Sequence, residues 1–159
     1  TRPTAAIPKI EVIDLDSVFS SELATWAAEA CARHPWNTQG IMQAAIQIQH
    51  ARDTQCEILD LSFLNLCELP SCLSMLQHVT DLDLANNNFT SIPSEVYDLP
   101  ALRELDLSYN DIPEEHLLFS GLRLNSLHVQ SQRLDKNSDI RRQIHTALPD
   151  LQYLDLDHI

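Results

Sequence analysis

The segments VTDLDLANNNF (79–89) and LRELDLSYNDI (102–112) decide the fold of this chain. Each has an apolar residue, then Leu-x-Leu, then an asparagine and another apolar residue at the same spacing. Three further segments repeat the pattern in part: CEILDLSFLNL (56–66), LNSLHVQSQRL (124–134) and LQYLDLDHI (151–159). The central leucines are 23, 23, 22 and 27 residues apart, at Leu59, Leu82, Leu105, Leu127 and Leu154. Such a period indicates structural repeats that each pack against their neighbours.

The alternation within each copy predicts a short β-strand whose two leucines point inward, and successive copies are expected to stack as a parallel sheet. Asn87 and Asn110 are expected to turn inward and satisfy backbone groups with their amides. Gln132 occupies the same position and can partly substitute, whereas Leu64 cannot. The sequence therefore predicts a modified hydrogen-bond ladder at the amino-terminal end of the sheet. The segment 94–99 is expected to return along the convex side as one helical turn.

This pattern resembles the leucine-rich repeat consensus L-x-x-L-x-L-x-x-N-x-L, followed by a second apolar residue and often proline. The second copy matches throughout and continues into Ile92-Pro93, and the third continues into Ile112-Pro113. The resemblance implies an α/β fold: a curved leucine-rich repeat solenoid with a short-stranded parallel sheet. Helical caps are expected at both ends, because the end faces of a solenoid need cover.

Two helices are predicted before the repeats. The first is expected from an N-cap at Asp16 or Ser17 to about Arg33, and apolar residues recur at helical spacing at Phe19, Leu23, Trp26, Ala27 and Ala30. The second is expected from Thr38 to about Arg52, with Ile41, Ala45 and Ile48 on one face. Trp26 and Trp36 are interpreted as packing residues of this cap rather than as a pair that stacks on a ligand.

Downstream, NSDIRRQIHTALPDLQYLDL (137–156) resembles the terminator of several eukaryotic leucine-rich repeat families, in which a helix precedes L-P-x-L-x-x-L-D. We therefore divide the chain into an N-terminal extension (1–14), a helical N-terminal cap (15–55), the repeats (56–136) and a C-terminal capping helix with the last repeat strand (137–159), all in one domain.

The amino-terminal layout suggests a narrower kinship. A tryptophan-bearing helical hairpin leads into ILDLSFLNLCELPSCL (58–73) and VTDLDLANNNFTSIP (79–93). This layout resembles the recognition domains of bacterial type III effectors of the IpaH, SspH and YopM group, over about residues 20 to 93. The repeats here are longer than the usual unit of that group, and the terminator is of eukaryotic type.

Composition excludes several classes of function. The formal net charge of −13 repels phosphate backbones, so we expect no nucleic-acid partner. No run of about 18 apolar residues occurs, which excludes a membrane span. With two glycines the chain has no glycine-rich phosphate loop, and no cofactor is expected. The four cysteines lie among apolar residues without a C-x-x-C motif, which favours buried free thiols and a reducing, cytoplasmic compartment.

Catalytic patterns are also missing. The seven histidines are scattered, with no H-E-x-x-H motif, and no G-x-S-x-G occurs. His116 follows Glu114 and Glu115 but is expected in a convex loop rather than in a metal site. Asp83 and Asp106 form a carboxylate pair, yet an open sheet offers no pocket that would shift their pKa values apart. We therefore expect neither an enzyme nor a metal site in this chain.

Binding is expected on the concave face of the sheet. The residue between the paired leucines forms one column, with Asp60, Asp83, Asp106 and His128 as members, and Asp81 and Glu104 lie in the column two residues earlier. Three residues after each aspartate come Phe63, Asn86 and Tyr109, of which the aromatics are expected to be exposed anchors. Two alternatives stay open: the aspartates are solvated scaffold, or Phe63 packs against its own repeat.

These features predict a monomeric protein-recognition module whose partner contributes a basic, partly apolar segment. The preferred context is the target-binding domain of a bacterial effector in the host cytosol. One alternative is an endogenous intracellular scaffold or regulator, for which the acidic surface only maintains solubility. Another is the substrate-recognition part of a larger enzyme, such as a ubiquitin ligase, with its catalytic domain outside this chain.

Overall fold

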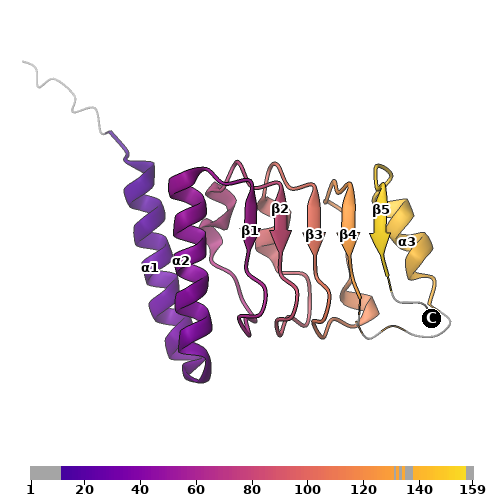
Figure 1. The fold of residues 1–159 in the computed structure, drawn as a ribbon, viewed down its shortest axis with the longest axis horizontal. Coiled ribbons are helices and arrows are strands. Elements are labelled where there is room, and N and C mark those ends of the chain that lie inside the picture. The colour runs from indigo at the N-terminus through magenta and orange to yellow at the C-terminus, as the bar shows by residue number, and fades with distance from the viewer. Residues whose placement is uncertain (1–11, 131, 133, 135–137, 157–159) are drawn as a thin grey trace, which may run out of the picture.

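The structure, a computed structural model, describes residues 12–130, 132, 134 and 138–156. Most of the predicted N-terminal extension (1–11) and the end of the last repeat (157–159) lie outside these residues. The described chain forms one five-stranded parallel sheet with its strands in sequence order. The strands are β1 (Ile58–Asp60), β2 (Asp81–Asp83), β3 (Glu104–Asp106), β4 (Ser126–His128) and β5 (Tyr153–Asp155). Figure 1 shows them side by side in this order, as the repeat spacing predicts.

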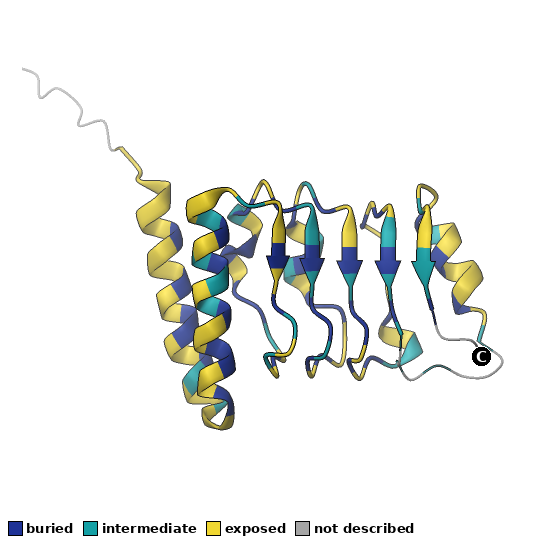
Figure 2. Cartoon of the chain, in the orientation of Figure 1, coloured by how far each residue is buried: buried dark blue, intermediate teal, exposed yellow. Residues whose placement is uncertain are grey.

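The central leucines stand in register across the sheet. Leu59 pairs with Leu82, and the row continues through Leu105, Leu127 and Leu154. The first four are at most 2% exposed, and Figure 2 shows the buried middle of β1 to β4, while Leu154 of β5 is half-buried. Removing each such side chain from water contributes about 1.5–3 kcal/mol, so this row is the centre of the core.

Each of the first three repeats returns behind the sheet through a short 3₁₀ turn. These turns are η2 (Ser71–Met75), η3 (Ser94–Asp98) and η4 (Glu114–His116). The helical turn predicted over 94–99 is confirmed as η3, which buries Val96. Leu73 of η2 is buried in the same way.

Buried amides close the turns between repeats. The Asn87 side chain accepts from the backbone N–H groups of Leu64 and Leu66 at 3.2 and 2.9 Å and donates to the carbonyl of Leu61 at 2.8 Å. Asn110 accepts from the Phe89 N–H at 3.1 Å and donates to the Leu84 carbonyl at 2.9 Å. The predicted inward orientation of both asparagines is confirmed.

Gln132 fills the same role one repeat later, as predicted. Its side-chain oxygen accepts from the Ile112 N–H at 3.1 Å, and its nitrogen donates to the Leu107 carbonyl. In three successive turns, therefore, backbone groups are bonded by the amide side chain of the following repeat: Asn87, Asn110 and Gln132 in order.

Two antiparallel helices stand beside β1 (Figure 1). Helix α1 (Leu15–Arg33) buries the five predicted residues Phe19, Leu23, Trp26, Ala27 and Ala30. Its N-cap is Asp14, whose carboxylate accepts from the N–H groups of Asp16 and Ser17. The predicted cap at Asp16 or Ser17 is therefore wrong by two or three residues. Asp14 and Asp16 both carry the carboxylate that a cap requires, so the residue type does not distinguish them. Helix α2 (Thr38–Thr54) buries Ile41 and Ile48 as predicted, and it buries Ala44 and Ala51, while Ala45 is half-buried.

Asn37 and Gly40 join the start of α2 to the first repeat. The buried Asn37 side chain donates to the carbonyls of Leu64 and Asn65 at 2.9 and 2.8 Å. An amide from outside the repeats thus binds the turn in which Leu64 replaces the usual asparagine. Gly40 permits this approach, because a Cβ at that position would lie 2.0 Å from the Leu64 carbonyl oxygen.

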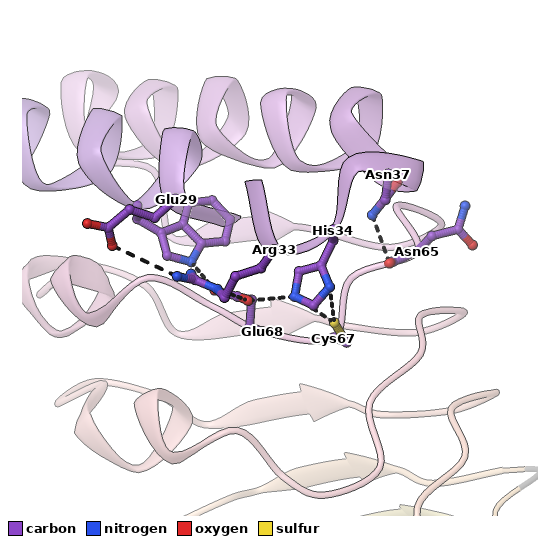
Figure 3. Close-up of polar contacts among 8 residues, drawn as sticks. Glu29, Arg33, His34, Asn37, Asn65, Cys67 and Glu68 are labelled. Carbon is purple, nitrogen blue, oxygen red and sulfur yellow. Dashed lines mark hydrogen bonds and ion pairs between the residues drawn. The ribbon is translucent and has the colours of Figure 1, made fainter. Parts of the chain in front are cut away.

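Glu68 makes the second connection between the helices and the first repeat (Figure 3). Its carboxylate accepts from Arg33 Nε at 3.0 Å and from Trp26 Nε1 at 3.0 Å, and it lies 2.7 Å from His34 Nε2. The Arg33 guanidinium, followed by His34 and Trp26, lowers the pKa of Glu68 to about 2, against an opposing contribution from burial. The ionised carboxylate therefore stabilises the folded chain.

At the other end, α3 (Ile140–Ala147) stands beside β5 (Figure 1). Ile140, Ile144 and Leu148 are at most 1% exposed, so the predicted apolar face of this helix is buried. The helix accounts for the long spacing before the last leucine.

Two expectations about single residues are wrong. Trp36 is 63% exposed and does not pack in the helical pair, because it lies in the 3₁₀ turn η1 (Pro35–Asn37) that links α1 to α2. Of the four free cysteines, Cys72 alone is buried; Cys31 and Cys56 are half-buried and Cys67 is exposed. An apolar neighbourhood in sequence does not determine which face of a turn a thiol occupies.

Replacing Gly40 by alanine tests the junction. The added methyl group collides with the Leu64 carbonyl and the Asn37 side chain, so we expect Gly40→Ala to lower the free energy of unfolding by about 2 kcal/mol, despite the better helix propensity of alanine. Urea denaturation followed by circular dichroism measures the change. Gln39→Ala, at the exposed neighbouring position, is the control and should change stability by less than about 0.5 kcal/mol. Equal stability of Gly40→Ala and the unaltered chain would contradict the close approach.

Replacing Glu68 by glutamine tests the ion-pair cluster. Because the folded-state pKa of Glu68 is depressed, its contribution is present above the ordinary value of 4.5 and is lost as the pH falls toward about 2. We expect Glu68→Gln to cost about 1–2 kcal/mol at pH 7, since Arg33 is partly exposed and screened. The stability difference between the two chains should shrink below pH 4.5 in urea titrations. A difference that does not change between pH 7 and pH 3 would contradict the role of the charge.

Candidate functional site

The exposed face of the sheet presents two rows of side chains. One row runs through Asp60, Asp83, Asp106, His128 and Asp155, which are paired in register. The other runs through Ile58, Asp81, Glu104, Ser126 and Tyr153. The structure therefore brings together the predicted strand residues on one surface.

A shallow groove of about 220 Å³ crosses this surface. Its walls carry four carboxylates on β2 and β3, beside an apolar and an imidazole side chain. They are Asp81, Asp83, Glu104, Asp106, Ile58 and His128, above Leu82 and Leu105. An open groove with this lining suits the charged and apolar side chains of an extended segment.

The aspartates also have a structural role. Asp60, Asp83 and Asp106 each accept, at 2.9 Å, the backbone N–H two residues further on. The same bond in three repeats closes the turn that leaves each strand. The same aspartates therefore stabilise the turns and form a charged surface. A scaffold role and a binding role for this row do not exclude each other.

The central aspartate of the row, Asp83, has a raised pKa. Burial raises the pKa of Asp83, and the carboxylates of Asp106 and Asp60 raise it further, against the bond from Ala85. Neighbouring strands lie about 4.8 Å apart, so Asp83 faces a like charge on either side, from Asp60 and from Asp106. A cationic group from a partner would relieve this repulsion.

Adjacent carboxylates without a basic or amide partner in the row lie on β1, β2 and β3, whereas Asp155 on β5 is paired within the sheet. On β4 and β5, His128 Nδ1 lies 3.3 Å from Asp155 Oδ2, and Gln130 Nε2 donates to Asp155 Oδ1. The His128 ring also lies 5.1 Å from the Tyr153 ring. His128, a predicted contact residue, is thus held by neighbours within the sheet.

The turn after each of the first three strands contains a residue in the left-handed region. Phe63, Asn86 and Tyr109 have φ values of 58°, 57° and 58°. Their N–H groups donate to the carbonyls of Ala85, Ser108 and Gln130, which fixes the turns. Asparagine suits this backbone, whereas an aromatic residue there costs about 1 kcal/mol.

Phe63 is 72% exposed and Tyr109 is 51% exposed, whereas Asn86 is half-buried. The predicted exposure of both aromatics is confirmed, and the alternative in which Phe63 packs against its own repeat is wrong. The left-handed backbone directs the Phe63 side chain away from the core. Aligning the copies could have revealed this, because Asn86 occupies the corresponding position.

Several exposed apolar residues lie outside the sequence predictions. Ile58 and Tyr153 are 61% and 54% exposed on the sheet, and simple alternation along the strand would have identified them. Met42 and Ile46 of α2 are 46% and 58% exposed, one helical turn apart. Their spacing places them together on the surface of the helix, but spacing alone does not tell that this pair stays exposed while Ile41 and Ile48 are buried.

Cys67 and His34 are residue types found in catalytic pairs, and they lie side by side near Glu68 (Figure 3). Cys67 Sγ lies 3.5 Å from His34 Nε2, but Glu68 lies closer to the same nitrogen, at 2.7 Å. Burial, followed by the charge of Glu68, raises the pKa of the Cys67 thiol. An activated cysteine requires the opposite shift, so the cluster fits a connection between helix and repeat.

Within the described residues, no group of three or more histidine, cysteine, aspartate or glutamate side chains is arranged to hold a metal ion. In the same part of the chain, no helix is both long and apolar enough to cross a membrane.

Curated relatives match about half of this chain. A leucine-rich repeat serine/threonine-protein kinase 1 of Caenorhabditis elegans is 31% identical over 51% of this chain and 3% of its own length. An adenylate cyclase of Neurospora crassa is 37% identical over 50% of this chain and 4% of its own length. The TMV resistance protein N of Nicotiana glutinosa is 37% identical over 46% of this chain and 6% of its own length. The chain thus spans a small fraction of these relatives.

A solved structure titled "Structure of Chaetomium Mex67:Mtr2 subunits" is similar at 24% identity, with a TM-score of 0.44. The similarity covers 66% of this chain and 86% of that one. A likeness at this level carries no functional information.

Two sequence profiles described as Leucine rich repeat match this chain, one over residues 55–112 and one over residues 101–140. The matched region contains β1 to β4 with their turns and reaches the start of α3. Residues 55–140 of this chain are leucine-rich repeats.

Proposed function

We propose that this chain is a protein-recognition module that binds a basic segment of another protein on the exposed face of its sheet. Leucine-rich repeat domains generally mediate protein–protein interactions, and their stacked strands offer extended binding surfaces. The observation that carries the proposal is the in-register row of Asp60, Asp83 and Asp106, flanked by exposed Phe63 and Tyr109.

The basic character of the partner follows from the charges. Four carboxylates line the groove on β2 and β3, and the whole chain has a net charge of −13. A lysine or arginine side chain laid across β2 and β3 would neutralise charges that now repel each other. The same field repels a nucleic-acid backbone, so a protein partner fits better.

In this proposal the repeats form a solenoid with α1 and α2 as one cap and α3 as the other, and the module acts as a monomer in the cytoplasm. The effector context rests on the amino-terminal layout alone. The three curated relatives are eukaryotic proteins, and they support neither this context nor that of an endogenous regulator. Either context is compatible with binding on the exposed face of the sheet around Asp60, Asp83 and Asp106, which we call the acidic face. Neither context requires catalysis by this chain.

Neutralising the aspartate row tests the proposal. In the variant Asp60→Asn/Asp83→Asn/Asp106→Asn the asparagine oxygens can still accept the turn N–H groups, so the fold should be retained. We expect binding to basic peptides on a synthetic array to weaken about tenfold, since three screened charge contacts of about 0.5 kcal/mol are lost. Fluorescence anisotropy at low and high salt measures the affinities, and circular dichroism verifies folding.

A matched control separates local from overall charge. The variant Glu22→Gln/Asp98→Asn/Asp150→Asn removes three exposed carboxylates outside the sheet face, so both variants change the net charge from −13 to −10 (−13 + 3). The control should bind like the unaltered chain. If both variants lose affinity equally, or if neither does, the sheet face is not the binding surface.

A further inference from the structure

A second groove lies between α2 and the turn that follows β1. It has a volume of about 560 Å³, and its apolar wall consists of Met42, Ile46, Phe63 and Leu64. Asn37, Gln39, Gly40, Gln43 and Asn65 complete the lining, so no charged residue lies in it. We call this feature the anchor groove.

The apolar wall is open to solvent. Met42 is 46%, Ile46 58% and Phe63 72% exposed, and they converge from two elements far apart in sequence. Contiguous exposed apolar residues of this kind mark binding surfaces more often than scattered ones do. Phe63 is moreover held in a left-handed turn where Asn86 serves the next repeat, so the core gains nothing from its ring. Residues with strained backbones cluster at functional sites, so this strain supports a binding role for the exposed ring.

The anchor groove adjoins the acidic face. Asp60 precedes Phe63 by three residues, which limits the separation of their backbones to about 10 Å. If a basic segment of the partner lies across Asp83 and Asp60 and continues toward α2, the residues of the segment that follow its basic residues therefore reach the anchor groove. Charge also argues against a second copy of this chain as the occupant, because each copy carries a net charge of −13.

We propose that the anchor groove binds a large apolar side chain of the same basic segment, next to its lysine or arginine residues. The inference rests on the proposed function, and it defines the partner's motif as basic residues followed or preceded by leucine, methionine or an aromatic residue. The acidic row provides attraction and orientation, and the groove provides an apolar contact that distinguishes this segment from basic segments in general.

Methyl NMR provides a direct test, because the chain has two methionines. Met42 lines the anchor groove, whereas Met75 lies in η2, half-buried against the core. The probe is a synthetic peptide of about 12 alternating lysine and serine residues, which spans up to about 40 Å, with a leucine at each end. In the control peptide serine replaces both leucines. We expect the leucine peptide to shift the Met42 methyl signal, leave Met75 unmoved and bind about tenfold more tightly than the serine peptide.

Two variants test whether the anchor groove causes the preference for the leucine peptide over the serine peptide. Phe63→Asn/Ile46→Gln replaces the wall with residues that suit a left-handed turn and an exposed helix position, so folding should be unaffected. It should abolish the preference for the leucine peptide. Leu15→Gln/Leu118→Gln removes two apolar side chains of similar exposure elsewhere, 57% and 62%, and should retain the preference.

The outcomes distinguish this inference from the proposed function. If both peptides bind equally and shift amides of residues 81–83 and 104–106 but not Met42, the anchor groove is not a subsite and the acidic face remains the binding surface. If neither peptide binds the folded chain, both proposals are overturned. A leucine preference that persists in the Phe63→Asn/Ile46→Gln variant would also overturn the anchor groove.

Discussion

The structure depends on keeping one row of leucines in register across five strands. Leu59, Leu82, Leu105, Leu127 and Leu154 are paired directly from strand to strand. A strand has a side-chain period of two, so once these leucines point inward, their immediate neighbours must point outward. The two rows of the acidic face are therefore a consequence of how the core packs.

The same constraint explains the double role of the aspartates. A short strand must turn immediately after its second inward leucine, and the aspartate between the leucines closes that turn through a backbone N–H. Repetition then aligns the carboxylates at the strand spacing, where burial and mutual repulsion raise the pKa of the central Asp83. A bond that is local in each repeat becomes a surface property when the repeats stack.

The junction with α1 and α2 solves a different problem. The turn of the first repeat receives the Asn87 amide from the second repeat, but Leu64 provides no amide of its own on the side of the helices. On that side Asn37 donates to the carbonyls of Leu64 and Asn65, Gly40 allows the necessary approach, and Glu68 bonds Trp26, Arg33 and His34. The anchor groove lies at this junction, so the contacts that hold the helices against the repeats also position its wall.

Local periodicity in the sequence is enough to predict the strands, the inward asparagines and the buried helix faces. The Leu-x-Leu spacing predicts the strands, the asparagine position predicts Asn87 and Asn110 inside, and helical spacing predicts the buried face of α1. These inferences hold because each rests on a period that the backbone imposes over a few residues. Aspartate and aromatic residues of the sheet face could be predicted in the same way.

Which residues far apart in the sequence meet depends on tertiary packing. Asn37 reaches a carbonyl 27 residues away, and Trp26 meets Glu68 across 42 residues, although neither pair has a signal in a single sequence. Only the packed structure shows that Trp36 and Cys67 are exposed, and that Met42 and Ile46 of α2 lie in one groove with Phe63. Local periodicity determines which face of an element is apolar, but the relative placement of the elements depends on side-chain volumes and hydrogen bonds that form only on folding.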